Sequence, residues 1–145
     1  MARGDVVVFN EAKAKMLDGD WASTDHFYCA VCDNTATPAA TTATPVLGDF
    51  TEVGNSGTYV TGGTDLGTLA DLVTQNAGVM KFDSATNPTW AQDASNDVDA
   101  YWGVIYNYTD AGKDAVAFVD LGWPVDMTAG DLTITWHTDG IFTIT

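Results

Sequence analysis

The feature that most restricts the fold of this chain is a series of short apolar runs. Each run ends at glycine, asparagine or aspartate, and the runs recur about every ten residues. Alternating apolar and polar residues are typical of β-strands with one buried face, and Gly and Asn supply the turns between strands. Short, evenly spaced strands are typical of sandwiches and barrels. The sequence therefore predicts an all-β domain.

About nine strands are expected. They are the runs 26–32, 50–53, 58–61, 68–74, 78–82, 100–108, 114–121, 131–136 and 141–144. The two most apolar segments, 100–106 and 115–119, should occupy the centre of the fold. Turn residues at 107–112 and 137–140 predict hairpins. We expect an antiparallel two-sheet sandwich, jelly-roll-like, with one short N-terminal helix.

The N-terminal segment differs in character from the rest of the chain. Residues 10–17 are strong helix formers, and Gly19 can supply a left-handed C-cap. The expected division is an arm and short helix at 1–20 and a β-sandwich at 21–145, because 145 residues suffice for one core. Removal of Met1 to Phe9 should leave the sandwich folded.

The charge distribution supports this division. The first 15 residues hold three basic and two acidic residues, a net charge of +1, whereas the remainder holds two basic and 18 acidic residues, a net charge of −16. An acidic surface repels nucleic acid and anionic lipid, so neither is an expected partner. No run approaches the roughly 20 apolar residues of a membrane helix, and none resembles a signal peptide. The basic strip is interpreted as an attachment arm, or alternatively as the solvated face of a helix.

Cys29 and Cys32 have the spacing of a redox or zinc half-site, but they lie in an expected strand. Residues three apart on a strand point to opposite faces and lie about 10 Å apart, which is too far for a disulfide. Two reduced, structural thiols are therefore expected. A zinc site would need more ligands, and only His26 and His137 are available.

Catalytic patterns are weak in this sequence. There is no Gly-x-Ser-x-Gly motif, and the acidic residues are spread through turns, so we expect no enzyme activity and no cofactor. The acidic cluster Asp93–Asp99 resembles the start of a calcium loop. However, Val98 stands where the invariant glycine belongs, so an acidic surface loop is the preferred interpretation and a weak calcium site the alternative.

Candidate contact residues fall in two groups. Residues in a long Thr, Ala and Pro-rich loop at 34–45 and tryptophans expected on loops are candidates for contact with a neighbouring subunit, whereas Trp102 and Trp136 should be core residues. The full set, with the N-terminal arm, is Ala2, Arg3, Gly4, Asp5, Val6, Val7, Val8, Phe9, Lys13, Lys15, Pro38, Pro45, Trp90 and Trp123.

Several motifs are similar to those of a known family. They are Arg3-Gly4-Asp5 with Phe9-Asn10, then Trp102-Gly103-Val104-Ile105-Tyr106-Asn107, Thr109-Asp110-Ala111-Gly112-Lys113, Val119-Asp120-Leu121-Gly122, Leu132-Thr133-Ile134-Thr135-Trp136 and Asp139-Gly140-Ile141. Together they resemble small virion structural proteins of tailed phages, continuously over roughly the last 45 residues. The cysteine pair and the Thr-Pro loop have no counterpart in that resemblance.

The resemblance implies a capsid decoration, or cement, protein. Such a protein would bind the outer surface of the major capsid protein shell, commonly as a homotrimer, after synthesis in the host cytoplasm. Repeated contacts from one oligomer would give high avidity. The alternatives are a tail or head-fibre component and a carbohydrate-binding module that recognises host glycan through exposed tryptophans.

Overall fold

A computed structural model describes all 145 residues, and it is an antiparallel, sandwich-like all-β fold as the sequence predicts. The main sheet has five strands in the order β1-β8-β7-β2-β3. Its members are β1 (Val6–Val8), β2 (His26–Cys32), β3 (Thr64–Thr68), β7 (Ala100–Asn107) and β8 (Ala115–Val125). The expected central position of the two most apolar segments is confirmed, because β7 and β8 lie inside this sheet.

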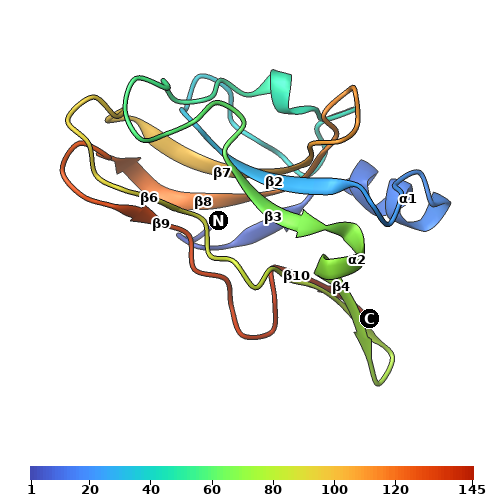
Figure 1. The fold of residues 1–145 in the computed structure, drawn as a ribbon. Coiled ribbons are helices and arrows are strands. Elements are labelled where there is room, and N and C mark those ends of the chain that lie inside the picture. The colour runs from blue at the N-terminus through green and yellow to red at the C-terminus, as the bar shows by residue number, and fades with distance from the viewer.

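The second layer is divided, where one sheet was expected. One small sheet has the order β10-β5-β4 and the other pairs β6 with β9. Their strands are β4 (Val73–Asn76), β5 (Val79–Phe82), β6 (Thr89–Trp90), β9 (Leu132–Thr133) and β10 (Phe142–Ile144). In Figure 1, β6 and β9 lie at the left of the molecule and β4 and β10 at the lower right.

Three short helices complete the chain: α1 (Asn10–Asp18), the 3-10 helix η1 (Leu47–Asp49) and α2 (Leu69–Leu72). The predicted N-terminal helix is confirmed, as is its left-handed C-cap at Gly19, where φ is 76°. None of these helices has the length and apolar character needed to span a lipid bilayer.

The core lies on both faces of the main sheet. On one face, the Phe9 ring lies 6.0 Å from the ring of Phe50 and 5.1 Å from that of Phe118. On the other face, a Cβ atom at Gly103 would lie 2.6 Å from Val119 Cγ1 and 2.8 Å from Ile134 Cδ1. The segment that follows β9 therefore packs directly on the backbone of β7, where only glycine fits.

The N-terminal segment is part of this body. β1 pairs with β8 along Val6↔Val119, Val7↔Phe118 and Val8↔Ala117, and Phe9 is fully buried. Residues 6–9 are therefore not a free arm. The structure argues against the expectation that Met1 to Phe9 can be removed without loss of folding, because their removal would delete a strand and a core aromatic ring.

Other expectations divide between confirmation and correction. The cysteine strand is β2, and both thiols are free and buried, on opposite faces as predicted. Residues 107–112 form the predicted hairpin turn between β7 and β8. Residues 137–140 form the predicted tight turn, which the antiparallel bridge His137↔Gly140 closes, although the flanking strands β9 and β10 belong to different sheets.

Candidate functional site: the β1 edge and the adjoining cleft

β1 is an edge strand whose outer side has no partner. Phe9 N–H donates to Val116 O, and Asp5 O accepts from Asp120 N–H, so the odd-numbered residues turn their backbone groups toward β8. Because these groups alternate in an antiparallel ladder, the N–H and C=O groups of Val6 and Val8 point outward. We call these four groups the β1 edge. They are free to pair with another extended chain.

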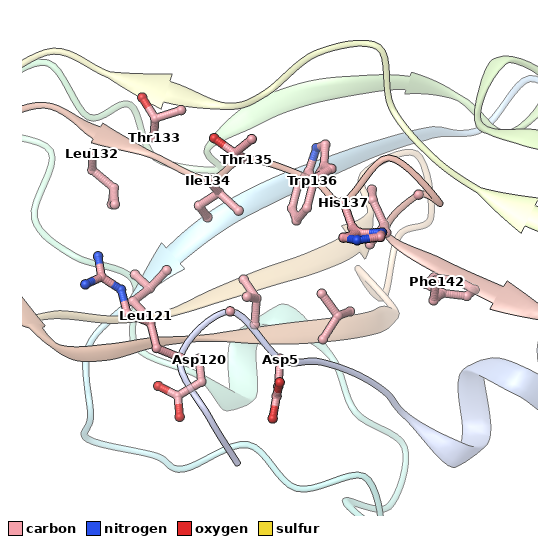
Figure 2. Close-up of a pocket in the computed structure, with 16 residues that line it drawn as sticks. Asp5, Asp120, Leu121, Leu132, Thr133, Ile134, Thr135, Trp136, His137 and Phe142 are labelled. Atoms are coloured by element: carbon pink, nitrogen blue, oxygen red, sulfur yellow. The ribbon is translucent and has the colours of Figure 1, made fainter.

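A cleft of about 510 Å³ opens beside β1, between the main sheet and residues 132–142. Its apolar walls include Val6, Val119 and Leu121 from the main sheet. Figure 2 shows Leu132 and Ile134 pointing into the cleft from the opposite wall, whereas Thr133 and Thr135 point away from it. The alternation follows from the two-residue period of extended chain, and burial agrees, since only the apolar residues of this segment are buried.

The N-terminal residues form a structured rim of the cleft. Gly4 N–H donates to Asp120 O at 2.7 Å, and Ala2 N–H donates to the Asp5 carboxylate at 2.7 Å. The Arg3 stem packs over Gly122, where a Cβ atom would lie 2.8 Å from both Arg3 Cγ and Cδ. Gly122 also has a φ of +92°, so two constraints favour glycine there. The exposed residues Ala2 to Asp5 are therefore fixed against β8.

The same contact brings Trp123 beside the N-terminal segment. Trp123 is 77% exposed, and it follows Gly122 directly. It lies within β8 and not on a loop, so its predicted loop position was wrong, but its exposure leaves it available for contact. Tryptophan and arginine are among the residues most enriched at the energetically important positions of protein contact sites.

Four of the sequence-predicted contact residues are buried. Phe9 is in the core, Trp90 lies in β6 with 4% exposure, and Pro38 and Pro45 are buried within the long loop. None of the four is available to a partner in this structure. Their apolar side chains stabilise the domain instead.

The two lysines of α1 lie away from the cleft. Lys13 is exposed and donates to Asn10 Oδ1 at 3.3 Å. Lys15 bonds Asp114 at 2.5 Å, in the turn region between β7 and β8. The basic strip is thus divided between the cleft rim, which has Arg3, and the helix. The structure does not bring these three cations together.

The titratable groups with shifted pKa values are structural. Burial raises the pKa of the Cys29 thiol to about 12, and burial with the nearby Glu52 raises that of Cys32. Hydrogen bonds from Thr68 and Thr128 lower the pKa values of Asp71 and Asp126, which stay ionised. No His, Cys, Asp or Glu residues form a group of three or more that could hold a metal ion.

The acidic cluster 93–99 is organised by Asn96, which is buried. Its side-chain amide accepts from Thr58 N–H at 2.8 Å and donates to Ala91 O at 2.9 Å. Asp97 accepts from Gly54 N–H at 3.1 Å. These side chains hold loops together, which accounts for the polar residues of the cluster.

Sequence reasoning missed the β1 edge and the cleft. The signal for a strand was present in the three consecutive valines, but their partner strand lies more than 100 residues away in the sequence.

Comparison with known proteins finds no relative: no family model, no curated protein and no solved structure matches this chain.

Proposed function

We propose that this chain is a non-enzymatic structural protein of a tailed-phage virion that decorates the capsid. It binds the outer surface of the major capsid protein shell and stabilises the head. The observation that carries the proposal is the β1 edge, an unpaired apolar strand edge beside an open cleft. An extended segment of the shell protein would pair with Val6 and Val8 and place alternate apolar side chains in the cleft.

The remaining surface supports this role. The chain carries a formal charge of −15, which favours solubility and keeps the body from adhering nonspecifically to nucleic acid. The motifs at 102–141 resemble those of phage virion proteins, and this resemblance is the reason for proposing a phage capsid shell as the partner. Contacts repeated over many shell subunits would convert modest strand pairing into stable attachment.

The test is binding to purified heads that lack the protein. Val8→Pro removes an outward N–H group and keeps the bonds to β8, and proline is tolerated on strand edges. We expect its occupancy on heads, measured by quantitative gel, to fall at least tenfold. Val8→Ala is the matched control, because it trims the side chain but keeps the N–H group, and it should bind as the natural protein does. Equal occupancy of the two variants would rule out the β1 edge as the contact.

A glycan-binding module or a tail-fibre component is the second candidate, and the exposed Trp123 favours it. Its indole could stack on a pyranose ring. In that case Trp123→Ala would abolish retention on host polysaccharide, while Val8→Pro would not. The number of copies per particle distinguishes a capsid decoration protein from a tail or fibre component, since decoration requires hundreds of copies per particle and a tail component far fewer.

A further inference from the structure

Arg3 is the only lysine or arginine that lines the cleft beside β1, where apolar side chains such as Val6 and Ile134 come from both walls. Four basic residues of the chain are paired with carboxylates, namely Lys15, Lys81 and the two histidines, and Arg3 is not among them. A guanidinium group is a planar fork of N–H donors that fits a carboxylate with two parallel bonds. The cleft therefore presents a cation that has no carboxylate partner within the chain.

Asp5 and Asp120 also border the cleft, but their carboxylates point away from it. Asp5 O accepts from Asp120 N–H at 3.3 Å, so the two residues lie opposite each other and their side chains share one face of the sheet. Val6 projects from the other face, because successive residues of a strand alternate. Figure 2 shows both carboxylates on the side away from the wall that Ile134 forms. Arg3 is therefore the permanently charged group that a partner meets inside the cleft.

The stem of Arg3 is held in place before a partner arrives. A Cβ atom at Gly122 would lie 2.9, 2.8 and 2.8 Å from Cβ, Cγ and Cδ of Arg3, so the stem lies directly on the β8 backbone. Gly4, the next residue in the chain, donates its N–H group to Asp120 O at 2.7 Å. Arg3 as a whole is nonetheless exposed. A side chain that is already held loses less conformational entropy on binding, which favours Arg3 as a contact.

We propose that the segment bound at the β1 edge carries one acidic side chain, two residues after the residue opposite Val6, and that this carboxylate bonds Arg3. This specificity depends on the proposed function, because it belongs to the shell segment that pairs with β1. Every ladder of the fold is antiparallel, so a segment that extends the main sheet in the same way passes Val8, then Val6, and continues toward Arg3. Alternate residues of the segment face the cleft, about 7 Å apart. The expected pattern is apolar-x-apolar-x-acid.

The net charge of the chain limits the segment to few acids. At −15 the chain repels a strongly acidic segment at long range, and Arg3 compensates only for the carboxylate that contacts it. A further acid on the other face of the segment would lie on the same side of the sheet as Asp5 and Asp120, where no such cation lines the cleft. A single acid that follows two apolar residues is therefore the composition that suits this cleft.

Binding of two synthetic peptides to the natural protein tests this specificity. One is acetyl-Thr-Val-Thr-Val-Thr-Glu-Thr-amide, which has the expected pattern, and the other has Gln in place of Glu. In NMR titrations the Glu peptide should bind about fivefold more tightly, the effect of one ion pair at a partly exposed position. The preference should disappear in Arg3→Gln. It should persist in Lys13→Gln, the matched control, which removes the same charge from an exposed side chain away from the cleft.

The results distinguish a failure of this specificity from a failure of the proposed function. Val8→Pro should weaken both peptides equally, since both need the β1 edge. Equal binding of the Glu and Gln peptides to the natural protein would overturn the acid preference alone, and a preference that survives in Arg3→Gln would overturn the role of Arg3. Failure of both peptides to bind would also overturn the specificity, while the occupancy of Val8→Pro on heads still decides the proposed function.

Discussion

The two edge strands of the main sheet, β1 and β3, differ in how well their outer sides are protected from pairing with another chain. β3 carries Asp65, has a register irregularity against β2 at Phe27/Tyr28, and runs directly into α2. The Leu66 carbonyl accepts a hydrogen bond from the Ser84 hydroxyl at 2.9 Å. Charge, irregular register and coverage are the usual means by which proteins prevent an edge from pairing with another chain.

β1 lacks these protections along Val6 to Val8, and its outer side is first covered at Asn10, whose N–H group donates to Ala40 O at 2.9 Å. It is three valines in regular register with β8, with no charged residue among them and no bond to the outward groups of Val6 or Val8. The contrast teaches that an open edge is not a general property of this sheet. The β3 edge is protected in four separate ways, whereas the outward groups of Val6 and Val8 in β1 are available for strand pairing.

The largest expected effect tests whether the β1 segment belongs to the body. Phe9→Ala should lower the free energy of unfolding by about 3–5 kcal/mol, because it removes a fully buried ring packed against Phe50 and Phe118. Urea denaturation measures this. Leu17→Ala is the control, because Leu17 is 84% exposed, and it should change stability by less than about 0.5 kcal/mol. Equal stability of the two variants would make the segment an arm after all.

The second-largest expected effect distinguishes the N–H groups on the two sides of β1. Val7→Pro removes the N–H group that faces Phe118, and it should cost about 1–3 kcal/mol because a ladder acceptor loses its donor. Val8→Pro removes an outward group and leaves the bonds to β8 in place, so it should cost clearly less than Val7→Pro. Chemical denaturation of both variants checks the difference. If Val8→Pro is as destabilising as Val7→Pro, the outer side of β1 is already paired.

A smaller effect is expected at the protected edge. Ser84→Ala deletes the hydroxyl that donates to Leu66 O and accepts from Thr86 N–H at 3.1 Å. The loss of stability should be about 1 kcal/mol, the usual contribution of a buried hydrogen bond. Hydrogen exchange should increase around β3 and stay unchanged in β1. Increased exchange in both strands would mean that Ser84 supports the whole sheet and not this edge.

Strands that pair with near neighbours in a continuous apolar run could be predicted from the sequence. β2, β7 and β8 were found because their side chains are buried on both faces, and the 107–112 turn fixes the register of β7 with β8. Residues 58–61 were wrongly predicted as a strand, since Thr58 bonds Asn96 instead of a neighbouring strand. The alternation of apolar and polar residues at 58–61 reflects side-chain contacts with another loop.

The run 68–74 was also misread, although its signal is local. Thr68 and Asp71 form a capping box that begins α2, which divides the run into the end of β3, the helix and the start of β4. Thr-x-x-Asp is a helix-start pattern, and the alternation of this run concealed it. The cleft could not be predicted at all, because its walls come from the two ends of the chain and the distance between them depends on packing.

The smallest expected effect is a pH dependence confined to the β3 side. Asp71 accepts from the Thr68 hydroxyl at 2.6 Å and from Thr68 N–H at 3.3 Å, and these bonds lower its pKa below the usual value of 3.8. A lowered pKa contributes stability that is present above the unfolded pKa and lost as the pH falls through the folded value. Acidification below about pH 4 should therefore loosen the start of α2.

The Asp71→Asn variant tests this, because its side chain cannot titrate. Its stability should vary less with pH over that range, while hydrogen exchange in β1 stays the same in both proteins. An identical acid response of the variant would show that Asp71 does not hold the end of β3, and the protection of that edge would then depend on Ser84, Asp65 and the register irregularity against β2.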